Sequence, residues 1–161
     1  MQLSLATLFL AASSAFAATI KPIEPLHVHN LTATAYKIDP TTAANASMSF
    51  SVKDHGTPGG PSHCHLSWKY GQVPKDQKSC HPVKYHVRFP KGAVDFNQFT
   101  LELERASGPS HYPSVAMLNS NENGTAPHTK WHCKNLPSIG TRLGCAYDGT
   151  LQMDPKVPKV E

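Results

Sequence analysis

The chain has 161 residues and a formal net charge of +4 at pH 7, which suits one mildly basic domain. Its lysines and arginines are scattered among prolines, glycines and acids, which argues against the basic stripes of nucleic-acid-binding proteins. No segment after the N-terminal one is apolar enough to span a membrane, so neither nucleic acid nor a membrane span is expected.

The N-terminal segment MQLSLATLFLAASSAFA carries no charged side chain and contains an apolar run over residues 3–10. This run is too short for a membrane-spanning helix, which needs about 20 residues. Ala15-Phe16-Ala17 fits the small-residue rule for cleavage by signal peptidase. We therefore expect a secretory signal at 1–17, a single secreted β domain at 18–153 and a flexible tail, rich in proline and charge, at 154–161.

Three sequons for N-linked glycosylation agree with secretion. They begin at Asn30, Asn45 and Asn123, and the third lies in the polar loop 119–125, where a glycan is best accommodated. The sequence therefore predicts a secreted glycoprotein.

Short runs of alternating apolar and polar residues follow, separated by many prolines and glycines. Such alternation is typical of strands with one wet face, and no window of helical length shows a 3.6-residue apolar period. The predicted fold is all-β, a compact antiparallel β-barrel or sandwich of about eight short strands with two disulfides. The expected strands lie at 26–38, 47–52, 63–70, 83–89, 99–104, 114–118, 129–134 and 143–153.

The alternation also predicts which side chains face the core, because residues two apart on a strand share a face. The predicted core-facing sets are Met48, Phe50 and Val52; Cys64, Leu66, Trp68 and Tyr70; Val83, Tyr85, Val87 and Phe89; and Phe99, Leu101 and Leu103.

Histidines stand beside three of the four cysteines, which are Cys64, Cys80, Cys133 and Cys145. Adjacent residues on a strand point to opposite faces, so a neighbouring His and Cys cannot readily bind one metal ion. An even number of cysteines on the core face of a secreted protein indicates two disulfides. Of the three possible pairings, the local one is favoured, since it closes two short loops that each stabilise by roughly 3 kcal/mol.

The histidines leave open an alternative function, an extracellular copper or zinc binder. His63 and His65 share a polar face about 7 Å apart, and a bridge between Cys64 and Cys80 would bring His81 close. Three imidazoles can bind copper or zinc. The C-x2-C spacing of many zinc sites is absent and no carboxylate accompanies these three histidines, so the primary expectation is no metal site and no cofactor.

A small secreted hydrolase is the second alternative. Glu102 and Glu104 share the polar face of one expected strand, and His86 and Arg88 share that of the run before it. A hairpin over 90–97 can set these faces side by side, which suits acid–base cleavage of RNA or glycans. Charge pairing across a solvated sheet explains the same pattern. Because no G-x-S-x-G elbow or glycine-rich phosphate loop accompanies these residues, we expect the protein not to be an enzyme.

Six segments between residues 48 and 153 carry a family resemblance: S-F-S-V-K-D, C-H-L-S-W, P-K-D-Q-K-S-C, F-T-L-E-L-E-R, W-H-C and C-A-Y-D-G. Together they resemble the small secreted fungal proteins of the Alternaria major-allergen-like family. The resemblance implies a compact antiparallel β-barrel, the disulfides Cys64–Cys80 and Cys133–Cys145, and no catalytic activity. It also implies a role as an allergen, effector or elicitor that binds host defence proteins or small phenolics. The abundance of histidine and the Gly/Pro-rich stretch 54–62 depart from the family pattern, so only the four cysteines are carried over.

The function predicted from sequence is thus that of a secreted, non-enzymatic, disulfide-stabilised β domain that acts by extracellular recognition. It resembles a fungal effector, elicitor or allergen-like protein. Its expected partner is an extracellular protein or small molecule, including host plant defence components.

Overall fold

The structure is a computed structural model. It describes residues 23–36, 45–56, 59–72, 74, 77–78, 80–82, 85–90, 96–106, 112–120, 130–135 and 141–156. The expected signal at 1–17, the sequon at Asn123 and residues 157–161 lie outside these ranges.

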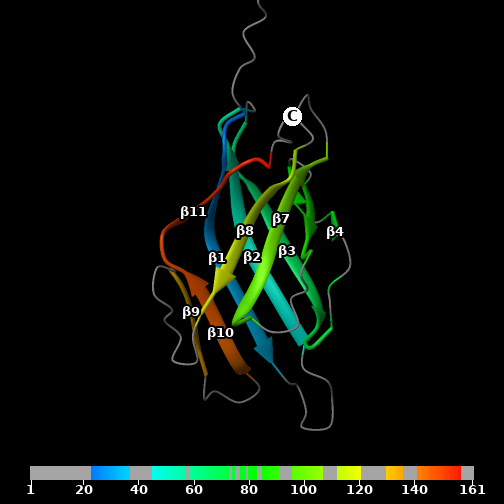
Figure 1. Ribbon diagram of the computed structural model, residues 1–161. Helices are drawn as coiled ribbons and strands as arrows, with labels where there is room; N and C mark the ends of the chain where they lie inside the picture. The colour runs from blue at the N-terminus through cyan, green and yellow to red at the C-terminus, as the bar shows by residue number, and fades with distance from the viewer. Residues whose placement is uncertain are drawn as a thin grey trace, which may run out of the picture.

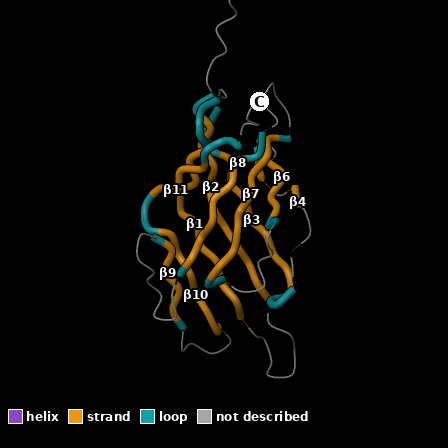
Figure 2. Tube along the Cα trace, viewed as in Figure 1, coloured by secondary structure: helices purple, strands orange, loops and turns teal. Residues whose placement is uncertain are grey.

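Eleven strands and no helix make up the described part of the chain, with loops at the ends of the strands (Figures 1 and 2). None of these described residues belongs to a helix long and apolar enough to cross a membrane. The strands are β1 (Leu26–Tyr36), β2 (Asn45–Asp54), β3 (Ser62–Lys69), β4 (Gln77–Lys78), β5 (Cys80–His81), β6 (Tyr85–Arg88), β7 (Gln98–Arg105), β8 (Ser114–Asn119), β9 (Trp131–Lys134), β10 (Thr141–Tyr147) and β11 (Thr150–Met153).

The strands form two antiparallel sheets that pack face to face (Figure 1). Sheet A has seven strands in the order β5-β3-β2-β1-β10-β9, and β11 pairs with the first part of β1. Sheet B has four strands in the order β4-β6-β7-β8. The all-β prediction is confirmed as a sandwich, whereas the described strands do not close into the barrel that the family resemblance implies.

Three strands exceed the eight expected. β4 and β5 have two residues each, which is too short to give an alternating pattern. The single run expected at 143–153 is divided into β10 and β11 by residues 148–149. Gly149 takes a φ of 85°, which an extended strand residue does not adopt and which glycine reaches without steric cost.

A β-bulge in β1 shifts the alternation of its side chains by one residue. The buried residues before the bulge are Leu26 and Val28, and those after it are Leu31, Ala33 and Ala35. Between His29 and Thr32 the pairing with β2 shifts register, so that Asn30 and Leu31 lie opposite Phe50. Asn30 takes a φ of 53°, in the left-handed region that Asn tolerates better than most residues. The bulge therefore keeps the apolar side chains of both halves of β1 in the core.

The core lies between the inner faces of the two sheets. The predicted core-facing residues of 47–52, 64–66, 85–89 and 99–103 are buried, which confirms the alternation. Trp68 and Tyr70 are partly buried and pack against the same core, while Val83 lies outside the described part. Phe96 lies in the expected loop 90–97, just before β7, and its side chain is fully buried in the core. Its carbonyl oxygen accepts a 2.7 Å hydrogen bond from the indole N–H of the buried Trp131, which ties the entry to β7 onto β9.

Each disulfide joins an edge strand to the body of sheet A. Cys64–Cys80 links β3 to β5 at one edge, and Cys133–Cys145 links β9 to β10 at the other. In both pairs the cysteines lie directly opposite each other in the strand register, with Cα atoms 4.1 Å apart. The predicted local pairing is confirmed, and all four cysteines are used.

The first residues of the expected tail at 154–161 are attached to sheet B. Pro155 forms an isolated β-bridge with Ser114 of β8, and the backbone N–H of Lys156 donates to the carbonyl of Pro113 over 2.8 Å. These contacts hold the chain after β11 against the edge of the other sheet.

A buried ion pair also joins the two sheets. Asp54 at the end of β2 accepts a bidentate pair of hydrogen bonds from Arg105 at the end of β7, with Nη2 2.8 Å from Oδ1 and Nε against Oδ2. The Tyr85 hydroxyl donates to the same carboxylate over 3.4 Å, and the backbone N–H of Gly56 donates over 2.9 Å. The side chains of Arg105 and Asp54 are only 10% and 5% exposed. A bidentate guanidinium–carboxylate pair fixes the geometry of the two side chains and also contributes binding energy. We call Asp54, Arg105 and Tyr85 the inter-sheet clamp.

The clamp predicts a loss of stability at high pH. Burial raises the pKa of Tyr85 from 10.0 to about 12, and the charge of Asp54 acts in the same direction. The folded state therefore stabilises the neutral phenol. This contribution is complete below the unfolded pKa of 10.0 and is lost as the pH rises through about 12.

We expect the free energy of unfolding, measured by urea denaturation at several pH values, to fall more steeply over this range in the wild type than in Tyr85→Phe, which has no phenol to titrate. Equal slopes for the two proteins would show that Tyr85 does not titrate within the clamp.

Candidate functional site

The outer face of sheet A gathers most of the histidines. Strand alternation places six of them on this face, and the ring of His55 packs on that of His27 with centroids 4.9 Å apart. Seven of the eight histidines that the structure describes are thus on one surface, and the eighth, His86, is on sheet B. We call this surface, with its imidazoles and the serines and threonines between them, the histidine face. Its histidines are His27, His29, His55, His63, His65, His81 and His132.

Two rows of side chains cross the face at right angles to the strands. In the first row, five residues lie successively opposite one another: His81 of β5, His63 of β3, Ser51 of β2, His29 of β1 and Thr150 of β11. With strands roughly 4.8 Å apart, the row extends about 19 Å. Nδ1 of His63 lies 2.9 Å from Oγ of Ser51, and Nδ1 of His29 lies 3.0 Å from Oγ1 of Thr150.

The second row runs beside the first. It consists of His65, Ser49, Thr32, Ala146 and His132, from β3 to β9. Oγ of Ser49 lies 2.8 Å from Nδ1 of His65, and Nε2 of His132 lies 3.0 Å from a carboxylate oxygen of Asp148. Both rows therefore carry imidazoles bonded to fixed neighbours rather than freely rotating on the surface.

A hydroxyl partner lets an imidazole gain a proton without losing its hydrogen bond. When the ring is neutral its bare nitrogen accepts from the hydroxyl, and when the ring is charged both nitrogens donate, so the hydroxyl oxygen accepts instead. Ser51, Ser49 and Thr150 therefore orient His63, His65 and His29 in either state. The side chains of His63 and His65 are exposed, and no described residue hydrogen-bonds their Nε2 atoms.

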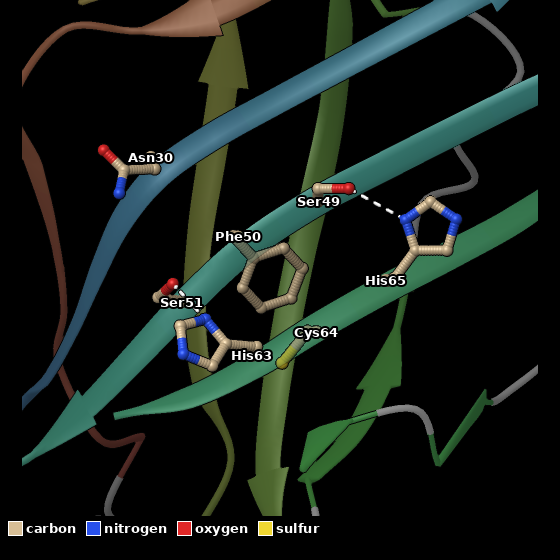
Figure 3. Close-up of a pocket in the computed structure, with 7 residues that line it drawn as sticks. All are labelled: Asn30, Ser49, Phe50, Ser51, His63, Cys64 and His65. Carbon is tan, nitrogen blue, oxygen red and sulfur yellow. Dashed lines mark hydrogen bonds between the residues drawn. The ribbon is translucent and has the colours of Figure 1, made fainter. Parts of the chain in front are cut away.

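Two shallow, open depressions mark the histidine face. The first lies between β1, β2 and β3, and Figure 3 shows His63 and His65 reaching from β3 to the serines of β2. Its lining residues are Asn30, Ser49, Phe50, Ser51, His63, Cys64 and His65. The second lies over β10 and β9 and includes His132, Lys134 and Asp148. Open depressions on a broad sheet suit an extended ligand better than an enclosed small molecule.

The predicted alternative of a three-histidine metal site is not formed. His63 and His81 lie opposite each other, as expected, but His65 bonds to a different serine and points away from His63 (Figure 3). Within the ranges that the structure describes, no three His, Cys, Asp or Glu side chains are placed to hold one metal ion.

The residues of the predicted hydrolase do come together on the outer face of sheet B. The β6–β7 hairpin sets His86 opposite Glu104 and Arg88 opposite Glu102. The Arg88 guanidinium contacts both carboxylates, lying 3.4 Å from Glu102 and closer to Glu104. This is a cross-strand ion-pair network, the arrangement that charge pairing on a solvated sheet predicts.

Two predicted glycosylation sites lie beside the histidine face. Asn30 is exposed at the bulge of β1 and lines the first depression (Figure 3). Asn45 begins β2. A glycan at Asn30 would project from the middle of this face, because β1 is a central strand of sheet A. Glycosylation at these sites stays a prediction.

Sequence reasoning missed part of the histidine face and all of the clamp. The H-V-H pattern at 27–29 showed that His27 and His29 share a face, but not which strand lies beside them. The order β3-β2-β1 brings that pair into line with His63 and His65. No local pattern could find the clamp, because Asp54 and Arg105 are 51 residues apart.

Comparison with known proteins gives no relative for this arrangement. No protein-family model matches the chain. No curated protein and no solved structure shows significant similarity to it.

Proposed function

We propose that this protein is a secreted, non-enzymatic recognition domain that binds its partner through the histidine face. The observation that carries the proposal is the pair of rows in register across sheet A, in which hydroxyl groups hold imidazoles in place. The disulfides fix both edges of this sheet, and the clamp ties β2 to the sheet behind it. A surface held in this way loses little conformational entropy on binding.

The extracellular location and the biological role rest on the sequence. The segment 1–17 supports secretion, and two disulfides are typical of proteins that fold in an oxidising compartment. The resemblance to the Alternaria major-allergen-like family supports a role as an effector, elicitor or allergen-like protein. The ion pairing of Arg88 with Glu102 and Glu104 supports a structural role for the predicted hydrolase residues.

An array of extracellular glycans and secreted proteins tests this proposal. The labelled wild type is compared with Ser49→Gln/Ser51→Gln, which removes the hydroxyl partners of His65 and His63 without changing charge. Glu102→Gln, on the outer face of sheet B, is the control. We expect array members bound by the wild type to lose at least about tenfold in signal with the serine variant and none with the control.

Loss of binding with Glu102→Gln but not with the serine variant would contradict the proposal. So would the absence of any array member whose binding depends on the two serines. Turnover of RNA or glycans that Glu102→Gln abolishes would show instead that the protein is a hydrolase.

A further inference from the structure

The chemistry of the histidine face indicates a class of partner, an inference that rests on the proposed function. We propose that the histidine face binds a carboxylated polysaccharide, and binds it more tightly as the pH falls from about 7.5 to about 5. The attraction comes from the positive charge that histidine gains over this range, on a surface whose other charges already favour an anion.

The fixed charges of the face are mainly positive. The strands carry Lys53, Lys69 and Lys134 on this side, and Lys130 precedes β9. The carboxylates on the same side are Asp148, which pairs with His132, and Asp154, which accepts a hydrogen bond from Gln152. The side chain of Asp54 turns inward to Arg105, so its charge does not belong to this face. Lys69 lies opposite Asn45, which lies opposite Tyr36, so neither neighbour of Lys69 in this row is a carboxylate. Lysines therefore outnumber exposed carboxylates four to two among the described side chains before any of the seven imidazoles is protonated.

The imidazoles of the histidine face lie close to one another. The rings of His27 and His55 are 4.9 Å apart, and those of His27 and His29 are 6.5 Å apart. One anionic chain can therefore contact several imidazoles of the face. A polyanion is attracted more strongly to a positively charged imidazole than to a neutral one, so its affinity rises as the pH falls. A carboxylate with a pKa of about 4 stays ionised at pH 5, so the ligand keeps its charge.

The neutral groups of the face favour a sugar chain over other polyanions. Ser47, Ser49, Ser51, Thr32 and Thr34 offer hydroxyls between the imidazoles, which suit the hydroxyls of a polysaccharide. Protein interfaces depend on buried aromatic or long apolar anchors, and single-stranded nucleic acids stack on aromatic rings. Among the described side chains of this face, the large exposed hydrophobic one is Tyr36, at the end of β1. The centre of the face therefore offers hydroxyls and imidazoles rather than such anchors.

The test measures binding of fluorescent polygalacturonate to the secreted protein at about pH 5 and about pH 7.5. Since Asn30 lies on this face, every protein is first treated with an endoglycosidase. Fully methyl-esterified polygalacturonate, which has the same sugar chain without its charge, is the ligand control. We expect binding at least about tenfold tighter at the lower pH, weakened by salt and absent for the ester.

Two variants locate the binding. His63→Gln/His65→Gln removes two exposed imidazoles from the face, and His86→Gln removes the one described on sheet B. We expect the first to lose at least about fivefold in affinity at pH 5 and the second to bind like the wild type. Equal binding at the two pH values, equal binding of the ester, or an equal loss with His86→Gln would overturn the inference.

Parallel titrations with an RNA oligomer, with vesicles of anionic lipid and with an acidic protein complete the test. Tighter binding of any of these than of polygalacturonate at pH 5 would also overturn it. If polygalacturonate does not bind but the array ligands still depend on Ser49 and Ser51, this inference fails and the proposed function stands. If neither polygalacturonate nor any array ligand binds through this face, both this inference and the proposed function fail.

Discussion

Replacing Arg105 with methionine is expected to lower the free energy of unfolding by about 3–5 kcal/mol, the largest effect of any single substitution considered for this protein. The change leaves the Asp54 carboxylate buried, with a side chain 5% exposed and without its bidentate partner. An uncompensated buried charge is more costly than the loss of the pair's own attraction. Urea denaturation followed by tryptophan fluorescence measures the effect, since Trp131 is buried between the sheets.

Two further variants show whether the loss of stability comes from the buried clamp or from the removal of any arginine. Arg88→Met removes an arginine whose side chain is 37% exposed on the outer face of sheet B, and it should cost less than about 1 kcal/mol. Adding Asp54→Asn to Arg105→Met removes the stranded charge, so the double variant should regain at least about 1 kcal/mol over Arg105→Met alone. Equal losses for Arg105→Met and Arg88→Met would contradict the account of the clamp.

Removing either disulfide is expected to cost about 2–5 kcal/mol. Cys133→Ala/Cys145→Ala releases β9, and Cys64→Ala/Cys80→Ala releases β5, each an edge strand of sheet A. The cost comes mainly from the greater freedom of the unfolded chain, and it includes the cavities left by the two buried cysteine side chains that each variant truncates.

Hydrogen exchange distinguishes a local from a global effect of these changes. The amides of β9 should lose protection in the first variant more than those of β6 and β7 in sheet B, because the edge strand keeps only its pairing with β10. Uniform loss of protection over both sheets would contradict the view that each disulfide attaches one edge.

The strand faces could be predicted because alternation is a local property of the chain. Met48, Phe50 and Val52 repeat at every second position, and the sheet buries them as expected. The position of β5 could not be predicted in this way, since two residues give no period and β5 is held by its pairing with β3. The bulge at Asn30 was not predicted, although the apolar positions of this run change phase between Val28 and Leu31.

The candidate site was predicted in part for the same reason. His63 and His65 share a face because they are two residues apart, and the disulfide brings His81 opposite His63. The extension of that row to His29 and Thr150 depends on strand order, which is set by contacts distant in sequence. The local pattern therefore indicated three histidines, with a metal site as the alternative function, whereas the full sheet shows seven histidines spread over a surface.

The measurement that tests the central claim most directly is an NMR titration of the histidine side chains with polygalacturonate at about pH 5. Ring signals assigned by single His→Gln substitutions report each imidazole separately, and His86 on sheet B is an internal control. Our account predicts that the signals of His29, His63 and His65 shift as the polymer is added, while that of His86 stays in place. A shift of His86 with no change at the histidine face would contradict it.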